Sequence, residues 1–240
     1  MPENPLLPNA KLRELYALMQ RARSLAPRNA KGPRFEAILA ATLMHAEPGD
    51  YISPPPGAPA AALLATERTT AKTRKKNEPK PATPLPANQR LATAAGIAQG
   101  LKLSANKKLA IFYTDATSAS ARTEAGWAEA LTYASEASLP LLIVIADITG
   151  GPAITNPKAI SWPSISKLSR RTGLPVLTVD GADAVAVYRV MQESTLRARM
   201  GDGAAVLWCV LPPTKDRTPA TDPIRNMQRY LAARNLLPRK

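Results

Sequence analysis

Hydrophobic residues in the second half of the chain gather in short, nearly continuous runs. These runs are KLAIFYT (108–114), PLLIVIA (140–146), PVLTVD (175–180) and AAVLWCVL (204–211). Strands that are apolar on both sides are expected when helices cover both faces of a parallel sheet. The pattern therefore predicts an α/β fold in which helices cover both faces of a parallel sheet.

The segments between these runs have the composition and spacing of helices. A small-residue helix, NQRLATAAGIAQGLKL, precedes the first run, and a capping aspartate, Asp222, followed by Pro223 predicts where the last helix begins. The other predicted helices cover residues 122–138, 163–172 and 183–199. Helices and strands thus alternate along this half of the chain.

Residues 9–52 predict two further helices. Asn9 can cap the first, which carries a stripe of apolar residues at helical spacing: Leu12, Leu15, Tyr16 and Met19. Pro33 opens the second, and the turn at Glu47–Tyr51 ends it.

Residues 53–87 differ from both flanking regions. They contain eight of the 24 prolines, and six basic residues lie between Arg68 and Lys80. Such a composition does not bury enough apolar area to offset the entropy of ordering the chain, which favours an extended linker. We therefore expect a helical extension (1–52), a Pro/Lys-rich linker (53–87) and an α/β domain (88–240).

Composition narrows the possible functions. The formal charge is +14, but part of it lies in the linker, where aromatic residues do not alternate with the basic ones, so a nucleic-acid-binding function is the least favoured. The chain has one cysteine, Cys209, and one histidine, His45. These counts exclude a disulfide framework and a metal site built from several histidine or cysteine residues within the chain. The longest apolar run, Leu139–Ala146, is too short to cross a membrane, and the first residues lack a secretory pattern, so a cytoplasmic protein is expected.

Several segments, taken in order, resemble one family. LATAAGIAQGLKL, EAGWAEALTYASEASLPLLIVIADI, LPVLTVDGADAVAVYRVMQESTLRARMGDGAAVLWCVL and DPIRNMQRYLAARNLL are similar to the alpha subunit of the thiamine-diphosphate-dependent 2-oxo acid dehydrogenase component, of the pyruvate and branched-chain type. The resemblance implies a thiamine-diphosphate-binding fold in a shortened, divergent member. It also implies an oxidoreductase with a beta-type partner chain in a two-plus-two assembly.

The family motif is Gly-Asp-Gly at one strand end and Asn-Asn at the next, where the acid and an amide hold Mg²⁺ against the diphosphate. Carried over, the motif aspartate is Asp115, its flanking glycines become Thr114 and Ala116, and the first asparagine becomes Asp147. These four residues are the candidate cofactor-binding residues, with Asp115 and Asp147 as candidate magnesium ligands. The literal Gly201-Asp202-Gly203 precedes a strand instead and is predicted to be a helix-to-strand turn.

Two functional hypotheses remain open. In the first, the chain is an enzyme subunit that binds thiamine diphosphate and Mg²⁺ together with a beta-type chain and decarboxylates a 2-oxo acid oxidatively. In the second, it is a catalytically degenerate paralogue that acts as a structural or regulatory subunit, with a beta-type chain or through self-association. The family activity is the first hypothesis. The replaced glycines and asparagine count against a cofactor role for Asp115 and Asp147, since side chains crowd the turn and Asp147 would add a negative charge beside a diphosphate. His45 falls in the N-terminal helical region, where an ordinary structural histidine is expected.

Overall fold

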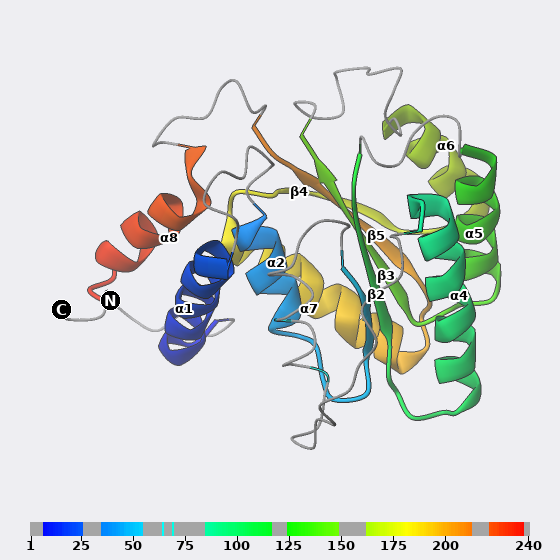
Figure 1. The fold of residues 1–240 in the computed structure, drawn as a ribbon, viewed down its shortest axis with the longest axis horizontal. Helices are drawn as coiled ribbons and strands as arrows, with labels where there is room; N and C mark the ends of the chain where they lie inside the picture. Colours follow the sequence, from blue (N-terminus) through cyan, green and yellow to red (C-terminus); the bar gives the residue numbers. More distant parts are fainter. Residues whose placement is uncertain are drawn as a thin grey trace.

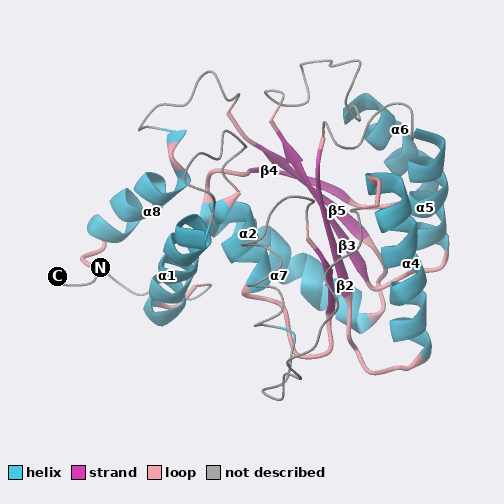
Figure 2. Cartoon of the chain, in the orientation of Figure 1, coloured by secondary structure: helices cyan, strands magenta, loops and turns pink. Residues whose placement is uncertain are grey.

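The protein is built around a parallel sheet of five strands in the order β1-β2-β3-β5-β4. The computed structural model describes residues 7–25, 35–54, 64, 69, 85–116, 124–148, 162–212 and 221–237. The strands are β1 (Tyr51–Ser53), β2 (Ala110–Asp115), β3 (Leu141–Asp147), β4 (Val176–Asp180) and β5 (Ala205–Val210). All four strand pairings are parallel, which confirms the predicted sheet (Figure 2).

Among the described residues, four helices lie on one side of the sheet. They are α1 (Asn9–Leu25), α2 (Glu36–Leu43), α7 (Ala184–Met200) and α8 (Pro223–Ala232). Figure 1 shows α2 and α7 beside the sheet and α1 and α8 farther out. Their buried side chains form one core with alternate residues of the strands, such as Ile111, Val144 and Leu207.

In the part of the chain that the structure describes, three helices cover the opposite side of the sheet. They are α4 (Ala87–Leu103), α5 (Glu124–Glu136) and α6 (Trp162–Thr172), which stand together at the right of Figure 1. Their core includes Phe112, Ile143 and Trp208, the strand residues that point away from the first core. Helices therefore cover both faces, as the apolar runs predict.

Capping aspartates mark the starts of two predicted helices, whereas Asn9, predicted to cap the first helix, is itself the first residue of α1. Asp222 accepts hydrogen bonds from the first backbone N–H groups of α8, and Asp183 does the same for α7. Gly201 ends α7 in the left-handed conformation, with φ of 96°. Gly201-Asp202-Gly203 is therefore a helix-to-strand turn, as expected.

The first region is not purely helical. The turn before Asp50 forms as predicted, but Tyr51–Ser53 then makes β1, which pairs with β2 at the edge of the sheet. Helices α1 and α2 share the core of α7 and of the sheet. The prediction that Pro33 opens α2 and most of the predicted linker lie outside the described residues.

Candidate cofactor site

The two candidate metal ligands end neighbouring strands. Asp115 is the last residue of β2 and Asp147 is the last residue of β3. In the register of these strands Asp115 is paired with Ala146, so Asp147 lies one residue farther along. The structure thus brings the two residues to one edge of the sheet.

Their side chains nevertheless leave the sheet on opposite faces. Successive side chains in a strand alternate between the faces. Tyr113, two residues before Asp115, belongs to the core beneath α2 and α7. Ile145, two residues before Asp147, belongs to the core beneath α4, α5 and α6. The one-residue offset in register therefore separates the two carboxylates.

Asp147 is held within the second core. It is only 1% exposed, and one carboxylate oxygen accepts a hydrogen bond of 2.9 Å from the indole nitrogen of Trp208 on β5. Trp208 is itself 1% exposed and packs in the same core. The Asp147 side chain therefore joins β3 to β5 beneath the helices.

The residues at the family's glycine positions are also buried. Thr114 donates a hydrogen bond from its hydroxyl to the carbonyl oxygen of Asp115, and Ala116 is 1% exposed. The backbone N–H of Ala116 donates to the carbonyl oxygen of Ala146, which continues the ladder between β2 and β3. Side chains thus occupy the positions where glycine would let a diphosphate approach the backbone.

These observations test whether the residues fit a shared magnesium ion. Mg²⁺ requires close, nearly octahedral oxygen ligands, so two protein carboxylates must converge to bind the same ion. Asp115 and Asp147 diverge, and no cluster of three or more histidine, cysteine or acidic residues occurs within the described part of the chain. As a pair they do not fit a bridging cation, and the cofactor role of the four candidate residues stays a prediction.

His45 occupies a structural position in the turn after α2 rather than within a helix. Its ring packs against the Tyr188 ring with centroids 4.3 Å apart, and Nε2 lies 3.1 Å from the Tyr188 carbonyl oxygen. Because a carbonyl only accepts, Nε2 carries a proton in this contact. Burial lowers the pKa of His45 to about 4.

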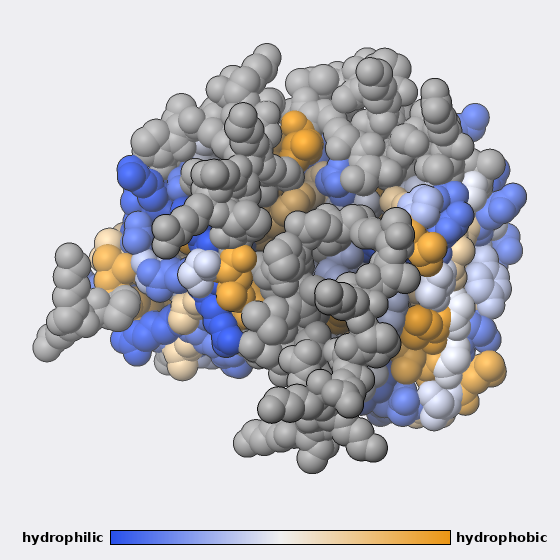
Figure 3. Space-filling model, viewed as in Figure 1, coloured by the Kyte–Doolittle hydropathy of each residue, from blue (hydrophilic) through white to orange (hydrophobic). Residues whose placement is uncertain are grey.

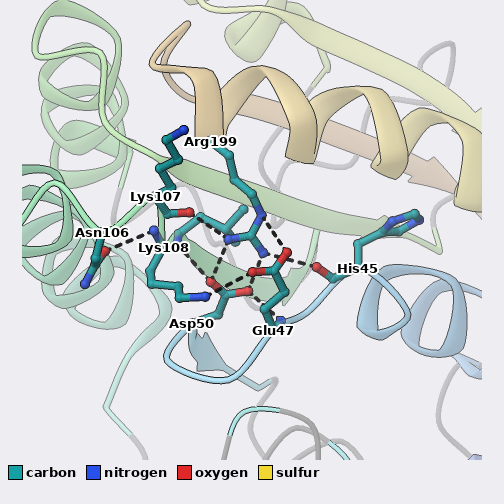
Figure 4. Close-up of polar contacts among 8 residues, drawn as sticks. His45, Glu47, Asp50, Asn106, Lys107, Lys108 and Arg199 are labelled. Carbon is teal, nitrogen blue, oxygen red and sulfur yellow. Dashed lines mark hydrogen bonds and ion pairs between the residues drawn. The ribbon is translucent and has the colours of Figure 1, made fainter.

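Sequence reasoning did not find an ion-pair network at the other end of β2 (Figure 4). Arg199 of α7 donates two hydrogen bonds, of 2.6 and 3.0 Å, to the fully buried carboxylate of Asp50. Asp50 also accepts from the backbone N–H groups of Glu47 and Leu109. The network joins the turn before β1, the start of β2 and the end of α7, and it carries no catalytic arrangement.

Sequence reasoning also missed a buried arginine at the carboxyl end of the sheet. Arg90, in the first turn of α4, is 9% exposed, and its Nη2 donates to the Ser53 hydroxyl at 3.0 Å and to the carbonyl oxygen of Tyr113 at 3.0 Å. Its guanidinium lies 4.9 Å from the centre of the Phe112 ring. An arginine in a helix of small residues gave no sequence signal that it would turn inward.

Comparison with known proteins decides the family. The family model described as "Dehydrogenase E1 component" matches residues 65–211, which is more than half of the 240 residues. The chain belongs to the dehydrogenase E1 component family. This confirms the family inferred from the order of its sequence motifs.

Among curated dehydrogenase E1 proteins, the chain is similar to alpha subunits. It is 28% identical over 160 residues to the "Pyruvate dehydrogenase E1 component subunit alpha" of Staphylococcus epidermidis, covering 59% of this chain and 42% of that protein. It is 32% identical over 97 residues to the "3-methyl-2-oxobutanoate dehydrogenase subunit alpha" of Mycobacterium tuberculosis, covering 40% of this chain and 26% of that protein. The chain thus spans less than half the length of these relatives.

A solved structure described as a thiamin diphosphate-dependent enzyme from Mycobacterium smegmatis is also similar. The match has a TM-score of 0.49 and 18% identity, and it covers 76% of this chain and 33% of the other. Within the described residues, no helix of this E1-family chain is long and apolar enough to cross a membrane.

Proposed function

We propose that this chain is an alpha-type subunit of a 2-oxo acid dehydrogenase in which the metal-bridged grip on thiamine diphosphate has been lost. Its role is then structural or regulatory within a cytoplasmic assembly. The observation that carries this proposal is the divergence of Asp115 and Asp147, with Asp147 held by Trp208. Family membership supports the assembly, and the geometry of the strand ends supports the loss.

A catalytic subunit is the second candidate, and Asp115 is the observation that favours it. This carboxylate ends β2, where the family resemblance places the cofactor aspartate, and it is partly exposed. In this alternative the chain binds thiamine diphosphate between itself and a beta-type chain. Of the two candidate ligands, Asp115 alone would then coordinate Mg²⁺, and Asp147 would not.

The outward face of α4 supports a partner chain. Gly96 in the middle of the helix and Gly100 in its last turn are exposed, and a methyl group added at either would meet no atom within 4 Å. Leu103 on this helix is 76% exposed, and Figure 3 shows hydrophobic side chains gathered in this part of the visible surface. Small residues let another backbone approach closely, so we propose that a beta-type chain, or a second copy, covers this face.

Calorimetry on the native assembly separates the two candidates. The chain is purified from its source together with any beta-type chain that accompanies it, and thiamine diphosphate is titrated with and without MgCl₂. The structural role predicts no magnesium-dependent increase in affinity at this chain. Asp115→Ala should then leave the magnesium dependence of binding unchanged, like the control Asp202→Ala, in which an exposed acid of the same charge is removed.

The opposite result would establish the catalytic candidate. In that case Asp115→Ala abolishes magnesium-dependent binding and 2-oxo acid decarboxylation, whereas Asp202→Ala retains both. A beta-type chain that does not co-purify, combined with an isolated chain that remains monomeric, would contradict both candidates.

A further inference from the structure

The unusual feature of Arg90 is a buried cationic nitrogen without an acceptor. All four hydrogen bonds of its guanidinium run from Nη2, to Ser53, Pro54 and Tyr113. Nη1 is buried and has no hydrogen-bond partner among the residues that the structure describes. A buried charged donor left without an acceptor costs free energy, so an acceptor supplied from outside would be held tightly.

A second buried donor without a partner lies beside the same aromatic ring. The indole nitrogen of Trp127 on α5 is buried and makes no hydrogen bond within the described part of the chain. The rings of Trp127 and Phe112 meet edge to face with centroids 5.8 Å apart, and the Arg90 guanidinium lies over the Phe112 ring. Two donors that lack acceptors therefore flank Phe112 beneath the first turn of α4.

The amino end of α4 adds a third attraction for negative charge. This helix has 17 residues and begins after Pro86, which provides no side-chain cap, and its first turn contains no acidic residue. The first backbone N–H groups of a helix have no acceptor within the helix, and the positive end of the helix dipole lies at this end.

We propose that the amino end of α4 is an oxyanion-binding site centred on Arg90, which takes a phosphate or carboxylate group without a metal ion. The guanidinium supplies the charge and the hydrogen bond from Nη1, and the Trp127 indole and the start of α4 supply further donors. This site is independent of the proposed function, because it uses neither member of the Asp115–Asp147 pair as a ligand. The oxyanion has two possible sources, a free phosphate or carboxylate and the diphosphate of thiamine diphosphate.

The charge of Asp115 gives the proposal a discriminating test. Its carboxylate lies within electrostatic range of Arg90, where it opposes the lowering of the arginine pKa by burial. Asp115 therefore competes with a bound oxyanion for the same positive charge. Asp115→Asn should strengthen metal-free anion binding, whereas the same substitution would weaken binding through a magnesium ion.

The experiment is a calorimetric titration of the full chain, with its partner if one co-purifies, in EDTA at constant ionic strength. Inorganic phosphate, acetate and thiamine diphosphate are the three probes, and they separate the two sources. We expect saturable phosphate binding that weakens by about tenfold or more in Arg90→Gln and strengthens about threefold in Asp115→Asn. Arg170→Gln, an exposed arginine on α6 that loses the same charge, is the matched control and should bind like the wild type.

Arg90→Gln also removes bonds that join β1 to β2, so Arg90→Lys serves as a second variant. Lysine keeps the charge but not the forked geometry, and affinity should fall between those of the wild type and Arg90→Gln. Binding to thiamine diphosphate but not to phosphate or acetate would assign the site to the cofactor's diphosphate. Three results would overturn the proposal: no saturable binding to any probe by the wild-type protein, equal affinity in Arg90→Gln and Arg170→Gln, or weaker binding in Asp115→Asn.

Discussion

The indole nitrogen of Trp208 donates its hydrogen bond to a carboxylate that is 1% exposed, that of Asp147. We predict that Trp208→Phe destabilises the fold by about 1–3 kcal/mol, because the carboxylate loses a donor that it cannot replace with water. Asp147→Asn keeps an acceptor for the indole without burying a charge, so it should lower the stability of the fold less than Trp208→Phe does. Urea unfolding followed by circular dichroism measures both, and a larger loss in Asp147→Asn would contradict this account.

The ion pair between Arg199 and Asp50 should contribute strongly to stability. The Asp50 side chain is 0% exposed and that of Arg199 13%, so the removal of one partner leaves the other charge poorly solvated. We expect Arg199→Leu to cost about 3 kcal/mol of unfolding free energy in denaturant titrations. Lys11→Leu, which breaks an exposed pair with Glu14, should cost less than about 1 kcal/mol, and similar losses in the two variants would refute the assignment.

His45 should make stability depend on pH in the mildly acidic range. Its pKa falls from 6.5 to about 4 on folding, so between these values the unfolded chain takes up a proton that the folded chain does not. Stability is therefore fully present above pH 6.5 and falls as the pH is lowered toward 4, by roughly 3 kcal/mol.

His45→Gln should flatten this dependence between pH 6.5 and 5, when the melting temperature is measured across a pH series. The nearby Glu47 has a pKa lowered from 4.5 by Lys108, so its contribution is lost only at lower pH. An unchanged slope in His45→Gln over this window would show that other groups dominate.

The exposed glycines of α4 predict a difference between the free chain and its assembly. Gly96→Ala and Gly100→Ala should each stabilise the isolated chain by about 0.5–1 kcal/mol, since alanine favours the helix and meets no neighbouring atom. In the assembly the added methyl groups would lie in the proposed interface and weaken it. Thermal unfolding of the isolated chain and analytical ultracentrifugation of the complex measure the two effects, and unchanged association would contradict an interface on this face.

The sequence was enough to predict the layers of the fold because its signals are local. Apolar runs place the strands from β2 to β5 within a residue or two, and Asp183 and Asp222 cap the helices that follow them. The strand at Tyr51–Ser53 was missed because it is only three residues long and its partner lies far away in the sequence. A local pattern carries little information about such a pairing.

The candidate site was harder to predict because it depends on register. Asp115 and Asp147 do end neighbouring strands, but both strands are buried on both faces. Without an alternation of apolar and polar residues, the sequence does not reveal which face each carboxylate takes. The sequence also did not reveal that the Arg90 side chain points inward, because its acceptors, Ser53 and Tyr113, lie on the separate strands β1 and β2.

The position of β1 constrains the order in which the protein takes shape during synthesis. Tyr51 pairs with Ala110, so 59 positions separate the two, and β1 leaves the ribosome well before its partner. Contacts between distant segments form slowly because a long loop must close first. Helices α1 and α2 are therefore synthesised before the sheet that they cover. A nascent chain that stalls before β2 would expose the apolar faces of these helices to chaperones.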